Sequence, residues 1–241
     1  MTELMNKDNF CISLHNVTKT VKTPDGMLDI VQDVSLKVKY QEALVIKGAS
    51  GSGKTTLLGL MAGLDQISSG DIELLGNALG DKNEEQRSAI RSGKVGFVFQ
   101  SFQLVQGATA LQNVMLPLEL RGDSDAYDRA HNSLQQVGLE FKKNTLIDHL
   151  SGGEQQRVSI ARAFAVQPKI LFADEPTGNL DAKTGRQIAD LMFRLRDESG
   201  TTLVLVTHET ELAERGDRQV LIDSGCLVTS DQTQNINLGQ T

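Results

Sequence analysis

Apolar and polar residues form short alternating or clustered runs over most of the chain, and these runs predict strands and helices. Residues 12–17 and 30–38 predict two strands, and the turn residues Thr23-Pro24-Asp25-Gly26 between them predict an antiparallel pair. Further strands are expected at 44–46, 71–75, 95–99, 170–173, 202–206 and 218–222, and helices at 55–64, 82–92, 124–137, 154–166, 182–198 and 209–214.

After residue 150 helices alternate regularly with apolar strands, which predicts an α/β fold with a mostly parallel sheet. The N-terminal antiparallel pair is expected to form a small β subdomain. The block from about 101 to 168 is rich in helical patterns and is expected to be a helical subdomain inserted in the sheet. We therefore predict a single domain over residues 1–230, followed by a short polar tail at 231–241.

The charge and the cysteine content argue against two classes of protein, basic nucleic-acid-binding proteins and structural zinc proteins. The 241 residues include 24 Lys and Arg and 31 Asp and Glu, and the net charge of −7 has the wrong sign for holding nucleic acid mainly by phosphate neutralisation. A local basic patch stays compatible with that balance. Cys11 and Cys226 show no metal-binding spacing, which argues against structural zinc. No basic segment followed by an apolar one opens the chain, so a cytosolic protein is expected.

Residues 95–118 contain no charged side chain and are long enough to cross a bilayer. Glutamines, Asn113, Pro117 and several hydroxyl side chains interrupt the segment, which is too polar for a lone lipid-facing helix. We reject a membrane span. An uncharged segment in the middle of a chain instead favours a surface on which another protein docks.

The run Gly48-Ala49-Ser50-Gly51-Ser52-Gly53-Lys54-Thr55 matches the pattern G-x-x-x-x-G-K-[ST] and lies between a predicted strand and a predicted helix. Glycines let successive backbone N–H groups surround phosphate oxygens at the start of a helix. Lys54 is expected to reach the β- and γ-phosphates and Thr55 to bind magnesium. A flexible glycine-rich turn is the alternative, but the strand and helix on either side argue against it. Thr56 occupies the place of the third glycine in a dinucleotide fingerprint, which is therefore incomplete.

Two adjacent carboxylates, Asp174 and Glu175, follow the apolar run at 170–173. Acidic pairs are commonly solvated loop residues. A charge at the end of a buried strand costs free energy, however, and its presence there favours a functional role. Asp174 is expected to hold magnesium, and Glu175 to orient or deprotonate the attacking water.

A second anion site is predicted where Leu150-Ser151-Gly152-Gly153-Glu154-Gln155-Gln156 opens a helix. Ser151 can cap that helix, and the two glycines leave its first N–H groups accessible. One monomer has little use for two phosphate sites about a hundred residues apart. A dimer with nucleotide sandwiched between a phosphate loop and the partner's second site uses both.

With these motifs in order, the sequence resembles the ATP-binding subunits of ABC transporters, whose signature is LSGGQ, from about residue 12 to about residue 228. The resemblance implies that Gln100 senses magnesium and water, that Ser151 and Gly153 contact the γ-phosphate across a dimer, that Asp181 links the two sites, and that His208 contacts the γ-phosphate. The implied catalytic set is Glu175, His208, Gln100 and Lys54; the ATP-binding set is Gly48, Ala49, Ser50, Gly51, Ser52, Gly53, Lys54, Thr55, Thr56, Ser151, Gly153, Glu154 and Asp181; and the Mg²⁺ set is Thr55, Gln100 and Asp174.

The residues at 95–118 and 174–181 are similar to those of the lipoprotein-releasing and macrolide-exporter branch, and within it to those of the stand-alone YbbA-like ATPases. The branch implies a second copy of the chain and a separate integral membrane permease as partners, at the cytoplasmic face of the inner membrane, with no nucleic acid. The segment 95–118 would dock that permease.

Three positions depart from the family pattern. Val21 stands where an aromatic residue usually stacks on adenine, so base recognition is open, and Phe10 and Tyr40 are the nearby rings in the sequence. Gln41 replaces a usual glycine and Lys47 adds a cation before Gly48.

A soluble ABC-type ATPase acting on ribosome or DNA is the second hypothesis, although such proteins usually carry fused cassettes or inserted coiled coils. A small P-loop kinase would leave residues 151–156 without a role.

Overall fold

The computed structural model describes residues 9–24 and 26–228. Contacts divide these residues into two compact units: one reaches up to Ile90 and resumes at Val206, and the other is Arg91–Leu205. The polar tail predicted at 231–241, and Asp25 of the predicted turn, lie outside the described residues. Each unit is built around its own strands.

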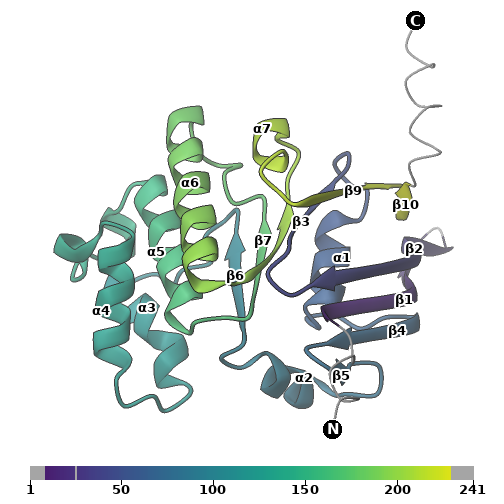
Figure 1. Cartoon of the computed structure of the whole chain (residues 1–241), viewed down its shortest axis with the longest axis horizontal. Coiled ribbons are helices and arrows are strands. Elements are labelled where there is room, and N and C mark those ends of the chain that lie inside the picture. The colour runs from purple at the N-terminus through teal and green to yellow at the C-terminus, as the bar shows by residue number, and fades with distance from the viewer. Residues whose placement is uncertain (1–8, 25, 229–241) are drawn as a thin grey trace, which may run out of the picture. The chain divides into compact units, whose positions relative to one another are not determined.

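An antiparallel sheet opens the first unit, in the order β2-β1-β4-β5 (Figure 1). Its strands are β1 (Phe10–Thr23), β2 (Gly26–Lys39), β4 (Ser69–Leu74) and β5 (Asn77–Ala78). β1 and β2 pair antiparallel, as the turn chemistry predicts. Both are longer than their apolar runs because only part of each strand is buried, so the hydrophobic pattern reports that part alone.

The first unit also contains the parallel pair β3 (Ala43–Lys47) and β9 (Arg218–Asp223), and β10 (Cys226–Val228) pairs antiparallel with β9. Residues 43–46 have no exposed surface, as expected for a strand covered on both faces. Helix α1 (Lys54–Met61) begins seven residues after β3 ends and packs on β2 and β4. Helix α7 (Thr210–Ala213) precedes β9, and α2 (Glu84–Arg91) lies at the unit boundary.

Three strands form the sheet of the second unit: β6 (Val95–Phe99), β7 (Ile170–Asp174) and β8 (Thr202–Val206), with β7 in the middle. β6 and β7 run parallel and pair Phe99 with Asp174 at their carboxyl ends. Parallel neighbours bring their carboxyl ends to the same sheet edge. The pairing therefore places the carboxyl ends of β6 and β7 side by side.

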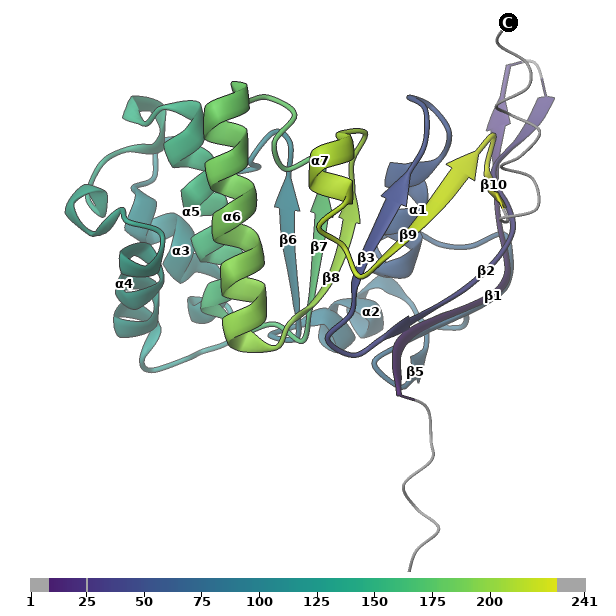
Figure 2. The same cartoon turned by 45° about the horizontal axis from the view of Figure 1, so that its top comes forward.

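The helices of the second unit are α3 (Ala110–Glu119), α4 (Ala126–Gln136), α5 (Gly152–Ala165) and α6 (Ala182–Ser199), with 3₁₀ turns at Glu140–Lys142 and Ile147–His149. α5 contacts β6 and the other three helices, and Figure 2 shows it running beside α6. The helices α3, α4 and α5 fall within 101–168. The limits of the inserted subdomain and of the single domain stay predictions.

Among the α-helices of the described residues, α3 is the one that the hydrophobic pattern did not predict. Pro117 lies inside it, and the helix has no acidic residue in its first turn and no basic residue in its last turn. Its start is fixed by a capping box, in which Gln112 N–H donates to Thr109 Oγ1 at 3.2 Å and Thr109 N–H donates to Gln112 Oε1 at 2.8 Å. Pro117 and the uncharged run that reaches residue 118 made this helix resemble an irregular segment.

Candidate functional site: two anion sites and a carboxylate cluster

The loop from Gly48 to Gly53 turns the chain from the end of β3 into α1. Lys54, the first residue of the helix, is 7% exposed, and its Nζ donates to the carbonyl oxygens of Gly48 at 3.0 Å and Ala49 at 2.7 Å. The ammonium group is thus held inside the curve of the loop. Thr55 is exposed at the start of the helix, and Thr56 is half-buried behind it.

The loop has the features of a phosphate cradle. Gly53 has φ 99°, and a Cβ there would come 2.5 Å from the Ile30 carbonyl oxygen, so that only glycine fits. A Cβ at Gly48 would come 2.3 Å from the Ile222 carbonyl oxygen. Ser52 Oγ is buried without a partner among the described residues. A polar orphan, a buried ammonium group and a helix N-terminus form a donor set that fits phosphate oxygens.

His208 belongs to the same unit as this loop. The residue before it, Thr207, is buried and donates its N–H to the Ile46 carbonyl oxygen at 3.3 Å. Ile46 lies near the end of β3, two residues before Gly48, where the phosphate loop begins. The bond from Thr207 therefore holds the backbone beside His208 to this end of β3. The imidazole is exposed.

The carboxylates stand at the end of β7 in the second unit. Residues 170–173 have no exposed surface, and Asp174 and Glu175 are half-buried. Glu175 has φ 48°, in the left-handed region that costs a non-glycine residue about 1–2 kcal/mol. Such strain at a polar strand end is typical of functional positions.

Gln100 and Asp174 line one cavity of about 360 Å³, together with Phe99, Ser101, Gln103 and Asn179. Gln100 Nε2 donates to Asn179 Oδ1 at 3.1 Å, and Asn179 Nδ2 donates to the Gln100 carbonyl oxygen at 2.9 Å. A Cβ at Gly178 would come 2.8 Å from Gln100 Nε2. The structure therefore brings together two of the three predicted magnesium ligands within this unit and shows what holds one of them.

The predicted second anion site is the N-terminus of α5. Ser151 caps the helix, and one oxygen of Glu154 accepts from the Ser151 N–H at 3.0 Å and from its hydroxyl at 2.9 Å. The other oxygen pairs with Lys142. The hydrogen bond from Lys142, followed by that from the Ser151 N–H, lowers the pKa of Glu154 to about 2. Glu154 is therefore a carboxylate that orders the start of the helix.

Gly153 and Asp181 lie beside this helix start. A Cβ at Gly153 would come 2.6 Å from Thr184 Cγ2, so the glycine allows α5 and α6 to approach closely. Asp181 caps α6, accepting from the N–H groups of Lys183 and Thr184 at 3.1 Å each. Its pKa is lowered chiefly by a hydrogen bond from the Thr184 side chain.

Two site residues, Asn179 and Gln156, were not assigned a role from the sequence. Gln156 has no exposed surface, and its Nε2 donates to the carbonyl oxygens of Phe99 and Pro176. It thus connects α5 with the ends of β6 and β7. A polar residue on the apolar face of a predicted helix was the available signal.

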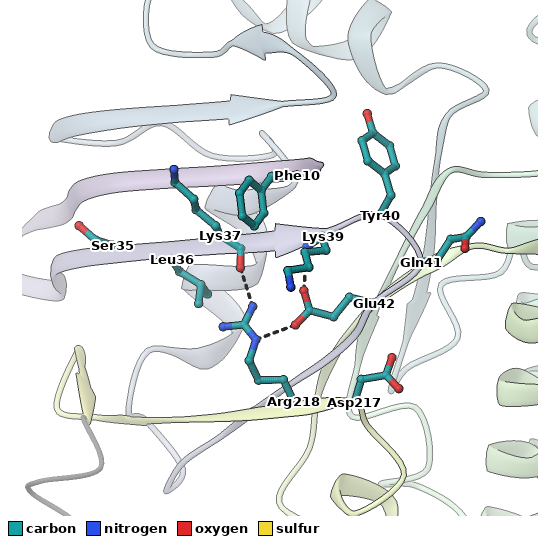
Figure 3. Close-up of a pocket in the computed structure, with 10 residues that line it drawn as sticks. All are labelled: Phe10, Ser35, Leu36, Lys37, Lys39, Tyr40, Gln41, Glu42, Asp217 and Arg218. Atoms are coloured by element: carbon teal, nitrogen blue, oxygen red, sulfur yellow. Dashed lines mark hydrogen bonds and ion pairs between the residues drawn. The ribbon is translucent and has the colours of Figure 1, made fainter. Parts of the chain in front are cut away.

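Phe10 and Tyr40 cannot substitute for the missing ring at Val21. Phe10 pairs with Lys39 at one end of the β1–β2 pair, whereas Val21 pairs with Leu28 near the other. Eleven residues of strand separate Phe10 from Val21, roughly 35 Å. Both rings line a different recess of about 680 Å³ (Figure 3), beside Glu42 before β3 and Arg218 at the start of β9. The phosphate loop follows the opposite end of β3.

Within the uncharged segment, Leu104 and Val105 differ in exposure. Leu104 is 7% exposed and belongs to the core, so within the segment predicted to dock a permease its side chain is not an available contact. Val105 is 47% exposed, and its backbone is held by Asn113, whose Oδ1 accepts from the Val105 N–H at 2.7 Å. Leu116 on α3 is 36% exposed. In the described part of the chain, every helix is too short or too polar to cross a membrane.

Comparison with known proteins identifies the family. The ABC transporter family matches residues 31–178. The ABC transporter ATP-binding protein YbbA of Escherichia coli K12 is 50% identical over 90% of this chain and 96% of YbbA. The macrolide export ATP-binding/permease protein MacB of Bdellovibrio bacteriovorus is 36% identical over 95% of this chain but 35% of MacB. The dimeric cassette MJ0796, bound to ADP and Pi after hydrolysis, superimposes with a TM-score of 0.84 at 38% identity, over 90% of this chain and 97% of that chain.

These likenesses confirm the predicted fold class and the resemblance to the lipoprotein-releasing and macrolide-export branch. They favour a transporter cassette over a soluble ABC-type ATPase. A match over 31–178 and 50% identity over nearly the whole length of YbbA decide the assignment. The chain belongs to the ABC transporter family, as an ATPase cassette that binds and hydrolyses ATP.

Proposed function

We propose that two copies of this chain close around ATP and drive a separate membrane permease. The observation that carries the proposal is the second anion site: α5 begins with Gly152 and Gly153, and the Gln155 N–H makes the first bond back, to Ser151, at 2.8 Å. The capping box uses the Glu154 N–H, which leaves the N–H groups of Gly152 and Gly153 at the helix start, where N–H groups favour an anion. The dimeric state of MJ0796 supports a sandwich in which a partner's phosphates use this site.

Each residue in the proposed site has a defined task. Lys54 and the N–H groups from Gly48 to Thr56 bind the phosphates of ATP, and Ser151 with Gly153 binds the γ-phosphate held by the partner copy. Glu175 accepts the proton of the attacking water, which His208 and Gln100 orient. Asp181 links the two sites of the dimer.

The donor set also fits magnesium, because hydroxyl, amide and carboxylate oxygens are the ligands this ion prefers. We assign its coordination to Thr55, Gln100 and Asp174. When bound, the ion neutralises charge on the β- and γ-phosphates.

The permease part of the proposal rests on the uncharged segment and on MacB, whose name joins ATP-binding and permease functions in one chain. Residues 100–118, called the docking segment below, leave Val105 and Leu116 exposed beside a buried scaffold. An apolar, uncharged patch of this kind suits a protein partner. In this proposal the ATPase acts at the cytoplasmic face of the membrane, held there by its permease.

Co-purification from a detergent extract tests the partner class. We expect the tagged chain to recover an integral membrane protein with few membrane spans and a large external domain. Recovery of ribosomes or DNA in place of a membrane protein would support the soluble alternative and contradict the docking proposal.

Val105→Glu is expected to reduce recovery of the permease about tenfold or more while basal ATP hydrolysis is retained. A charge at a half-exposed position is tolerated in water but costs free energy once a partner removes that water. Quantitative pull-down with each variant measures this. Phe141→Glu is the matched control, because Phe141 is 98% exposed in the same unit but lies outside the docking segment. Equal loss with both variants would mean that Val105 has no specific part in docking.

A further inference from the structure

Helix α5 is bonded to the backbone that follows Gln100. Arg162, in the last turn of α5, donates from Nη1 to the Gln103 carbonyl oxygen at 2.7 Å and from Nη2 to the Phe102 carbonyl oxygen at 3.1 Å. A planar guanidinium presents its donors in a fixed fork, so one side chain sets the orientation of both carbonyl groups. Burial lowers the pKa of Arg162, but an arginine keeps its charge in a protein.

The backbone held in this way has an unfavourable conformation. Phe102 has φ 60° and Gln103 has φ 48°, so two consecutive non-glycine residues are left-handed. Such residues persist only where surrounding contacts impose the conformation. Arg162 bonds the carbonyl groups of both residues, and the Phe102 ring lies against Gly152 at the opposite end of α5.

Gln100 lies between two attachment points on the same helix. Gln156 bonds the Phe99 carbonyl oxygen on one side, and Arg162 bonds residues 102 and 103 on the other. The Gln100 side chain reaches the cavity that it shares with Asp174. Only Ser101 separates Gln100 from Phe102, so the 102–103 backbone limits where Gln100 can lie relative to Asp174.

We infer that Arg162 is a positioning residue for ATP hydrolysis: through the carbonyl groups of Phe102 and Gln103 it sets the place of Gln100, without contacting the nucleotide itself. The inference rests on the role proposed for Gln100. The two hydrogen bonds of Arg162 also connect helix α5 directly to the start of the docking segment.

Steady-state ATP hydrolysis by the full chain with Arg162→Met tests the inference. Methionine keeps an apolar stem but removes the donors, so we expect kcat to fall about tenfold, with the KM for ATP changed less than about twofold, since misplacing a catalytic group affects the chemical step. Arg157→Met is the matched control. Arg157 lies on the same helix and donates to a different carbonyl oxygen, that of Val137, at 3.2 Å. Its kcat should stay near wild type, and thermal unfolding measures the stability of both variants.

A double variant separates positioning from general loss of structure. Gln100→Ala should itself lower kcat, and in that background Arg162→Met should have no further effect, because the residue that it misplaces is gone. Arg162→Lys, which cannot bond both carbonyl groups, should recover little of the lost rate. Wild-type kcat in Arg162→Met, or multiplied losses in the double variant, would overturn the inference. A fully active Gln100→Ala would instead contradict the proposed site, and the inference with it.

Discussion

Lys54→Ala is expected to weaken ATP binding by about a hundredfold or more. The Lys54 ammonium group is buried inside the phosphate loop, 2.7–3.0 Å from two carbonyl oxygens, and charge-assisted hydrogen bonds of this kind contribute about 1.5–3 kcal/mol each. Losing one or two such bonds to phosphate, together with the charge, corresponds to that loss of affinity. Isothermal titration calorimetry with ATP measures it directly.

Lys47→Ala is the control for the change in net charge. Lys47 ends β3 just before the loop, so its removal changes the charge of the chain equally but leaves the cradle intact. We expect its Kd for ATP to change less than about threefold. Similar Kd values for both variants would remove Lys54 from the phosphate site, provided that circular dichroism shows both to be folded.

Glu175→Gln is expected to bind ATP normally, to hydrolyse it at least about a hundredfold more slowly, and to accumulate as a dimer. Glutamine matches the size of glutamate but cannot accept the proton of water, and positioned acid–base groups contribute about 10²–10⁴ in rate. The phosphate loop is unchanged, so ATP stays bound between the two copies. Size-exclusion chromatography with light scattering, with and without ATP and magnesium, reports the dimer.

Glu198→Gln serves as the matched control, because it removes the same charge from an exposed residue. Glu198 forms an ion pair with Arg194 on α6. It should remain as active as wild type and dissociate after turnover. A Glu175→Gln protein that stays monomeric at high concentration and hydrolyses ATP fully would exclude Glu175 as the base.

The sequence predicted most of the buried elements because burial leaves a pattern. β6 and β8 begin and end at the predicted residues, since most of their residues are buried and a polar residue follows each strand. Glycine spacing and a capping serine, the signals for the two proposed anion sites, are local and could also be identified in the sequence. Roles for individual site residues rest on the proposed mechanism, and the variants above test them.

Other features depend on distances that no local pattern contains. Phe10 and Tyr40 lie near Val21 in the sequence, but a long strand separates Phe10 from it. Leu104 and Val105 are apolar neighbours in the sequence, but the first is buried and the second is exposed, with its backbone bonded to Asn113. The links from Gln156 and Arg162 to the residues beside Gln100 join positions about sixty residues apart.

The contact at Gly178 has a consequence for how sequence variation should be judged at this position. Gly178 is exposed and its φ is not in the left-handed region, so a small side chain there would be tolerated by the backbone. A Cβ would nevertheless meet the amide of Gln100, which is the movable end of a flexible side chain. The fold accommodates the substitution by giving way at Gln100. A screen that scores protein abundance would therefore classify position 178 as tolerant, whereas one that scores turnover would classify it as intolerant.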